Sequence, residues 1–397
     1  MSRRRAFAQR QCPVCGSGRS RLLFHQSFER LLHVELLEGY DVIVCLDCGA
    51  GFADDIPEQS VFDDYYRDLS KYDNAVRGGK ESPASKSRFE EAASGIETFV
   101  ETQDARILEI GCGSGHLLDA LARRSFANLR GADPSPACAS VAGEKSVPVE
   151  VATVSSIPAP EKPYDFLILM GVIEHIRDLD CTVDQFHRLL RIGGRVYIEV
   201  PDGSRLDPSL DAPFQEFSME HINFFSTRSL TNLMHRRGFR AIATGRARRA
   251  QNETICLSAY GVYERSYGPS PMERDTETER GIAAYVQGCQ LQDSRIRSRI
   301  EEALPRGEKM TVWGVGTHTL RLLATGGLDP SRISVFVDSN PKYQRHTLRG
   351  IPVISPGEMK GHSEPILISS RGFQREIHDQ IRNRLGLTNR LILLYET

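Results

Sequence analysis

The stretch RILEIGCGSGHLLDAL (Arg106–Leu121) joins an apolar run to a helical pattern through a turn with three glycines. Glycine lets a backbone take left-handed conformations and approach a ligand closely, so such a turn at a strand end favours a bound small molecule. The spacing is G-x-G-x-G, whereas a dinucleotide fingerprint has G-x-G-x-x-G. Glu109 precedes the first glycine, within reach of the turn or of a ligand's ammonium group. The stretch predicts the first strand, turn and helix of a cofactor-binding α/β sheet.

The residues that follow alternate apolar strands with helical patterns, as a parallel βαβ sheet does. The second strand ends at Asp133-Pro134, where an acidic side chain can accept both hydroxyls of a ribose. Ser155 and Ser156 come after the third strand, where an adenine edge would lie. The fourth strand opens into a loop with Glu174 and His175, and a Gly193-Gly194 turn precedes the fifth. The expected strands are Arg106–Ile110, Asn128–Ala132, Val149–Val151, Phe166–Met170 and Arg195–Val200.

Two C-x-x-C-G knuckles stand near the N-terminus, one at Cys12 and Cys15 and the other at Cys45 and Cys48. Each places two thiolates on one tight turn, and together they offer the four sulfurs that structural zinc prefers. All four ligands come from the protein, which leaves no open position for catalysis. The spacing therefore predicts a structural zinc; a pair of redox dithiols and a chance pattern are the alternatives.

Composition bounds the remaining possibilities. The chain has 397 residues, enough for two to four domains, and a formal net charge of −2 gives no electrostatic case for nucleic acid. It has no run of about 18 apolar residues and no apolar segment after the basic MSRRR start, so neither a membrane span nor a signal peptide is expected. The remaining five cysteines are scattered, which suits a reducing cytoplasm. The expected domains are a zinc module at 1–60, a tyrosine-rich segment with a helix at Ser87–Glu101 within 61–103, the cofactor domain at 104–262, a helical linker at 263–307 and a smaller Rossmann-like α/β domain at 308–397.

From Arg106 to about Gly238 the series of motifs resembles the class I S-adenosylmethionine (SAM)-dependent methyltransferases. The resemblance implies a Rossmann-like domain whose glycine turn lines SAM, whose second-strand acid binds the ribose and whose fourth-strand loop faces the reacting methyl group. The residues assigned to the cofactor are Glu109, Gly111, Cys112, Gly113, Gly115, His116, Leu117, Asp133, Pro134, Ser155, Ser156, Met170, Gly171, Val172, Glu174 and His175.

The order of parts along the whole chain resembles the bacterial C-methyltransferases that act on nucleotide-linked 4-keto-6-deoxy sugars. The resemblance implies that His221, with Glu220 as its neighbour, removes the proton alpha to the ketone, and that the enolate attacks the methyl group. Tyrosines after the zinc module also enter that family's active site; the local candidates are Tyr65, Tyr66 and Tyr72. The chain departs from the family at Ser218, where a tyrosine is usual, and in the turn that opens its last domain.

Two alternative functions remain open. The same scaffold suits an O- or N-methyltransferase for another small molecule, and a non-catalytic protein that binds SAM and zinc belongs to a different class. The expected partner is a small-molecule substrate, with neither nucleic acid nor membrane involved, and the oligomeric state is not predicted. The last domain either contacts the nucleotide sugar or only packs; its turn at Gly314 and Gly316 lacks a third glycine because Thr319 stands there, which disfavours a dinucleotide site.

Overall fold

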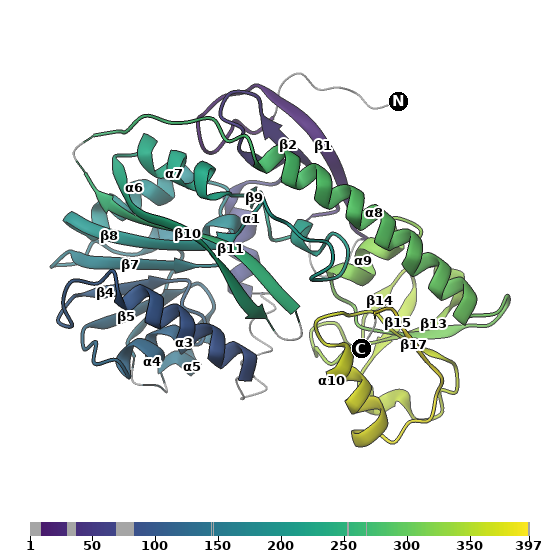
Figure 1. Cartoon of the computed structure of the whole chain (residues 1–397). Helices are drawn as coiled ribbons and strands as arrows, with labels where there is room; N and C mark the ends of the chain where they lie inside the picture. The colour runs from purple at the N-terminus through teal and green to yellow at the C-terminus, as the bar shows by residue number, and fades with distance from the viewer. Residues whose placement is uncertain are drawn as a thin grey trace.

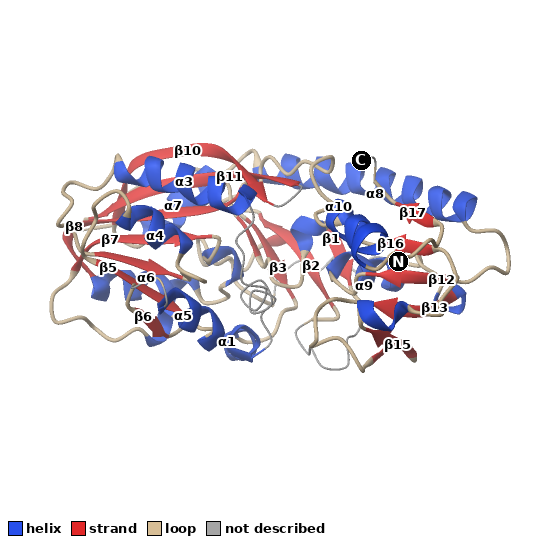
Figure 2. Cartoon of the chain, turned by 90° about the horizontal axis from the view of Figure 1, so that it is seen from below, coloured by secondary structure: helices blue, strands red, loops and turns tan. Residues whose placement is uncertain are grey.

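The computed structural model of the chain describes residues 9–29, 37–68, 83–143, 145, 147–251, 254–266 and 268–395. The strands of this part form sheets of seven, four and six strands. The seven-stranded sheet lies at one end of the molecule and the six-stranded sheet at the other, with the four-stranded sheet between them (Figures 1 and 2). None of the described helices is long and apolar enough to cross a lipid bilayer.

The central sheet has the order β10-β11-β8-β7-β4-β5-β6, parallel from β8 to β6 and antiparallel at the β10–β11 edge. Phe166 and Ile168 of β7 pack with α3 and α4, while Leu167 and Leu169 pack under α6 and α7, because successive strand residues face opposite sides. Both faces are thus buried, which explains the continuous apolar runs. The elements are β4 (Ile107–Ile110), α4 (His116–Ala122), β5 (Leu129–Asp133), α5 (Pro136–Gly143), β6 (Val149–Val151), β7 (Tyr164–Met170), α6 (Leu179–Leu189), β8 (Leu190–Pro201), α7 (Thr227–Arg236), β10 (Phe239–Gln251) and β11 (Thr254–Arg265), with α3 (Pro83–Glu97) packed alongside.

Three local predictions for this region need correction. The expected turn at Gly193-Gly194 lies inside β8. The pairing of β7 with β8 shifts register there, because Tyr164 pairs with Leu190 whereas Phe166 pairs with Arg195. Helix α3 begins at Pro83, a residue suited to the first helical turn, and ends at Glu97 instead of continuing to 101. The long β10–β11 hairpin is absent from the expected strands, because β10 alternates arginine with small residues and so carries a weak apolar signal.

The N-terminal sheet has the order β1-β2-β3-β9 and is antiparallel throughout. Its first three strands come from the cysteine-bearing segment: β1 (Ser20–Ser27), β2 (Gly39–Cys45) and β3 (Gly51–Asp54), followed by α1 (Gln59–Asp68). The fourth strand, β9 (Asn223–Phe224), belongs to the loop after β8, and it pairs Phe224 with Gly51 and Asn223 with Phe52. The cysteine segment and the loop that carries His221 are therefore joined in one sheet.

The C-terminal sheet has the order β14-β15-β13-β12-β16-β17, and its core strands are parallel. Trp313, Val337 and Ile368 fill one face, and Val312, Phe336 and Leu367 fill the other. Its elements are β12 (Met310–Trp313), α9 (Thr317–Ala324), η4 (Pro330–Arg332), β13 (Ile333–Val337), β14 (Thr347–Leu348), β15 (Ile351–Ile354), η5 (Pro356–Met359), β16 (Ile366–Ile368), α10 (Gln374–Asp379), η6 (Gln380–Arg384) and β17 (Leu391–Leu393).

Helix α8 (Thr278–Ala303) has 26 residues and runs from the N-terminal sheet to the C-terminal sheet (Figure 1). Its first half buries Ile282 and Tyr285 against aromatic residues of the N-terminal sheet and of the loop before β9. Its second half buries Ile296 and Ile300 in the core of the C-terminal unit. Both ends are therefore packed, and the segment expected as a linker is a structural element shared by two cores.

Candidate active site

The glycine turn between β4 and α4 has the backbone conformation that its sequence predicts. Gly111, Gly113 and Gly115 have φ angles of 74°, 50° and 71°, in the left-handed region that glycine adopts without strain. A Cβ on Gly111 would lie 2.5 Å from Cγ2 of Val172, so this glycine allows the turn to pack against the loop after β7. A Cβ on Gly113 would meet no atom within 4 Å. The turn is thus packed against Val172 at Gly111 and open at the Cβ position of Gly113.

Two buried carboxylates stand at the ends of the neighbouring strands β4 and β5. Asp133 accepts hydrogen bonds from the backbone N–H of Gly113 at 2.8 Å and from that of Ser135 at 2.9 Å. Glu109 is 3% exposed, and its Oε2 has no hydrogen-bond partner among the described residues. Burial, together with the charge of Asp133, raises the pKa of Glu109 well above its usual range. A ligand with hydroxyls and an ammonium group, as SAM has, would supply the partner that Glu109 lacks.

The other residues expected at the cofactor differ in whether their side chains can reach a ligand at the turn. His116 stacks on Phe89 with ring centroids 5.7 Å apart, and Lys145 Nζ lies 2.6 Å from its Nδ1; burial lowers the pKa of His116 to about 4. The side chains of Leu117 and Cys112 point into the core, so only their backbone is available to a ligand at the turn. Ser155 and Ser156 lie exposed on η1 (Val154–Ser156), where both hydroxyls bond to Thr153. Pro134, Met170, Gly171 and Val172 lie partly buried along the ends of β5 and β7.

The loop after β7 brings Glu174 and His175, on η2 (Ile173–His175), to the same edge of the sheet. Glu174 is 3% exposed, and burial raises its pKa to about 8. His175 Nδ1 lies 2.9 Å from the backbone oxygen of Glu220, and its Nε2 lies 3.8 Å from Oε1 of Glu174. Because a carbonyl oxygen only accepts hydrogen bonds, Nδ1 of His175 carries a proton, and in the neutral ring Nε2 carries the lone pair.

The loop before β9 places His221 beside His175, with ring centroids 5.0 Å apart. Nδ1 of His221 lies 3.2 Å from the backbone oxygen of Glu216 and 3.8 Å from its carboxylate, so Nε2 again carries the lone pair. Glu220 accepts a hydrogen bond at 2.7 Å from the hydroxyl of Tyr65, on α1. Tyr66 packs edge-on against His175, at 5.7 Å between centroids. Tyr72 lies outside the described residues.

Residues that sequence reasoning missed complete this cluster. Glu216, on η3 (Gln215–Phe217), holds the His221 ring, and its own N–H donates to the hydroxyl of Tyr285 on α8. Burial raises the pKa of Glu216 to about 7. Arg249 of β10 bonds both carboxylate oxygens of Glu199 at 2.8 Å. Ser218, which stands where the resembling family has tyrosine, accepts from the backbone N–H of His221 at 3.3 Å and so shapes the loop. In the sequence, only the five-residue separation of Glu216 and His221 could have indicated that these two residues are in contact.

The four knuckle cysteines lie together at the N-terminal sheet. Sγ of Cys12 is 3.6 Å from that of Cys48, and Sγ of Cys15 is 3.5 Å from that of Cys45. Ligand atoms of all four lie within 4.8 Å of one another. A tetrahedral zinc with bonds of about 2.3 Å needs sulfurs about 3.8 Å apart, so the donor set fits this ion. The glycine after each knuckle has a positive φ, and its N–H returns to the carbonyl of the first cysteine in the knuckle.

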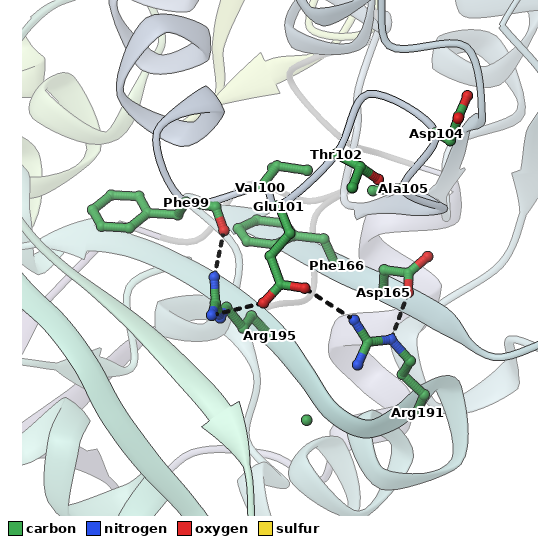
Figure 3. Close-up of a pocket in the computed structure, with 11 residues that line it drawn as sticks. Phe99, Val100, Glu101, Thr102, Asp104, Ala105, Asp165, Phe166, Arg191 and Arg195 are labelled. Atoms are coloured by element: carbon green, nitrogen blue, oxygen red, sulfur yellow. Dashed lines mark hydrogen bonds and ion pairs between the residues drawn. The ribbon is translucent and has the colours of Figure 1, made fainter.

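A separate cavity of about 140 Å³ lies at the opposite, amino-terminal edge of the central sheet (Figure 3). Arg191 and Arg195 line it, and both pair with Glu101; Arg191 also pairs with Asp165 at 2.5 Å. Both arginines are therefore already paired with carboxylates of the protein itself. Ligands of open α/β sheets bind at the carboxyl ends of the strands, so this cavity is not assigned to the active site.

Comparison with known proteins finds similarity in the central part of the chain. Residues 85–244 match a family model described as a methyltransferase domain. The ubiquinone biosynthesis O-methyltransferase of Xylella fastidiosa is 32% identical over 110 residues, which cover 26% of this chain and 44% of that protein. A probable S-adenosylmethionine-dependent methyltransferase of Mycolicibacterium smegmatis is 28% identical over 138 residues, 34% of this chain and 51% of that protein. The chain thus spans about half the length of the curated relatives it matches.

Among solved structures, magnesium protoporphyrin IX methyltransferase from Synechocystis PCC 6803 with bound SAH is similar, at 13% identity and a TM-score of 0.39. The match covers 52% of this chain and 99% of that one. The family match therefore shows that residues 85–244 are similar to a methyltransferase domain.

Proposed function

We propose that this chain is a SAM-dependent methyltransferase whose acceptor is a small molecule bound between the glycine turn and the His221 loop. One observation carries the proposal: the open turn with Glu109 and Asp133, and the cluster around His175 and His221, lie at the carboxyl ends of adjacent strands. SAM supplies an electrophilic methyl group when bound. The residues of the chain would orient it, hold the acceptor and accept a proton from it.

For the acceptor, we propose a nucleotide-linked 4-keto-6-deoxy sugar. The order of parts favours it: a four-cysteine module, a class I methyltransferase domain and a C-terminal α/β unit. In this reaction Nε2 of His221 takes the proton alpha to the ketone, and the C–H electrons form the enolate. The enolate carbon then attacks the methyl group, and the C–S electrons leave with S-adenosylhomocysteine. Glu216 would hold the imidazole in the required tautomer, and Tyr65 with Glu220 would line the acceptor pocket.

O-methylation is the second candidate, because several curated relatives are named as ubiquinone biosynthesis O-methyltransferases. The same imidazole would then accept a hydroxyl proton, and oxygen would attack the methyl group. Both candidates use a structural zinc in the same way: it would hold the knuckles of the N-terminal sheet, to which the His221 loop is joined through β9.

Proton exchange separates the two candidates. The protein would be incubated in D₂O with S-adenosylhomocysteine and a panel of nucleotide-linked ketosugars, and deuterium at the alpha carbon followed by mass spectrometry. We expect exchange with one of these sugars, its loss in His221→Ala, and its retention in the exposed control His25→Ala. Labelled SAM and the same panel, extended with phenolic acceptors, would then identify the product. Methylated phenol without any exchange would establish O-methylation; absence of transfer to every acceptor and of SAM binding would contradict the proposal.

A further inference from the structure

Two histidines and one buried glutamate face one another at the acceptor end of the site. They come from two segments, η2 for Glu174 and His175 and the loop before β9 for His221. One ligand atom from each lies within 4.8 Å of the others. Ligands that share one ion at bonds of about 2.0–2.2 Å stand roughly 3–4 Å apart, so small side-chain rotations would complete such a geometry.

Each of the two imidazoles makes a hydrogen bond of the kind that metal-binding histidines commonly make. Nδ1 of His175 donates to the carbonyl of Glu220, and Nδ1 of His221 donates to the carbonyl of Glu216. Histidines that bind metals commonly donate their second ring N–H to a backbone carbonyl, which fixes the tautomer and the ring orientation. In the neutral form of both residues the lone pair is thus on Nε2.

The third donor is the carboxyl group of Glu174, one oxygen of which makes no hydrogen bond to the described residues. Oε2 of Glu174 is buried and has no hydrogen-bond partner among the described residues. A buried polar oxygen in this position costs free energy that a cation would recover. Its electrostatic surroundings include Arg88, Glu216 and Glu199, of which Glu199 is already paired with Arg249. The donor set, with its unpartnered buried oxygen, therefore favours a cation.

We infer that Glu174, His175 and His221 form a second metal site, separate from the four thiolates, for one divalent cation of the class Mn²⁺, Fe²⁺, Co²⁺ or Zn²⁺. Imidazole and carboxylate ligands of this kind suit these ions and leave further coordination positions open. The functional part of the inference rests on the proposed function: the lone pair of His221 that binds the cation is the one that takes the acceptor's proton. A bound cation therefore inhibits methyl transfer.

Binding is tested on the zinc-loaded full chain, in which the four thiolates are already occupied. The protein is titrated with Mn²⁺ and, in parallel, with Co²⁺. Loss of the free-Mn²⁺ electron paramagnetic resonance signal reports the first ion, and visible absorption bands without thiolate charge transfer report the second. We expect one additional ion per chain. Glu174→Gln keeps the shape of the side chain but removes its charge, and should weaken binding at least tenfold.

The matched control is His25→Ala, because His25 is exposed, pairs with Asp41 at 2.7 Å and lies on β1, the edge strand opposite β9 in the N-terminal sheet. It should bind the ion as the unmodified chain does. His221→Gln is a second variant in case Glu174→Gln does not fold, which thermal unfolding will show. Failure of both Mn²⁺ and Co²⁺ to bind, or equal affinity in the unmodified chain and the folded variant, would overturn the site.

Inhibition is tested separately, once an acceptor is known. The methyl-transfer rate should fall with the same half-saturating Mn²⁺ concentration as the spectroscopic titration. A rate that rises with occupancy would overturn the inhibitory role. If the chain transfers no methyl group to any acceptor, the proposed function fails, while the metal titration still decides the site.

Discussion

Replacing Gly113 by alanine tests the assignment of the glycine turn most directly. Gly113 has a φ of 50°, and the added Cβ would meet no protein atom within 4 Å, so the folded chain can accommodate the methyl group. The backbone cost of an L-residue in this conformation is about 1–2 kcal/mol. For a domain of this size that corresponds to a fall in melting temperature of roughly 2–8 °C.

The effect on cofactor binding should be larger than the effect on stability. The methyl group occupies the open side of the turn, beside the N–H of Gly113 that bonds Asp133. Displacing a ribose from Asp133 loses at least one hydrogen bond to a charged group, about 1.5–3 kcal/mol. At 1.4 kcal/mol per tenfold, the dissociation constant for S-adenosylhomocysteine should rise roughly 10–100-fold, measured by isothermal titration calorimetry.

Gly307→Ala is the matched control, because Gly307 has a φ of 84°, and its Cβ would also meet nothing within 4 Å. It lies in the turn before β12, so it should share the stability loss and bind S-adenosylhomocysteine normally. Affinity within twofold of the unmodified chain in Gly113→Ala, or an equal loss in Gly307→Ala, would refute the assignment of the open side to the cofactor.

Three further predictions concern stability. Chelation of zinc, or Cys48→Ser, should lower the melting temperature. Metal analysis should show the release of about one zinc per chain, because four thiolates hold one ion. An unchanged melting temperature would contradict a structural role. Asp293→Ala should cost about 3–5 kcal/mol in denaturant unfolding, since it leaves the guanidinium of Arg321 buried without its partner; a loss below 1 kcal/mol would argue against it. Burial lowers the pKa of His318 to about 3, so the unfolded chain binds the extra proton between pH 6.5 and 3. Stability should therefore fall as the pH drops through that window, by about 2 kcal/mol at pH 5; His318→Phe should remove this term, and an unchanged pH profile would count against it.

The parts of the fold that local sequence determines were predictable. The glycine turn needs only its own residues, and the parallel strands are apolar because helices cover both faces. The ends of β4, β5 and β7 fall within two residues of their predicted positions. Side-chain direction was not visible, because Leu117 follows the turn in sequence yet points into the core.

The acceptor side depends on contacts that sequence spacing does not carry. β9 has two residues, too few for a periodic signal, and it pairs with β3 about 170 positions away. Tyr65 meets Glu220 at a separation of 155 residues. His221 is held by Glu216, although Glu220 is its neighbour in sequence. Tertiary structure decides these pairings, so a sequence could nominate the residues without showing which of them touch.

Helix α8 limits how the parts of this protein can be exchanged. Asp293 on its second half pairs with Arg321 of α9, while Tyr285 and Cys289 on its first half accept hydrogen bonds from backbone N–H groups of the loop before β9. A chimera that joins a foreign C-terminal unit at residue 305 would cut off the ion pair, and one joined at residue 265 would disturb the loop that holds His221. Inserting or deleting residues inside the helix rotates its second half relative to its first half by about 100° per residue. Recombination between relatives should therefore succeed only where α8 and both of its contact surfaces come from one parent.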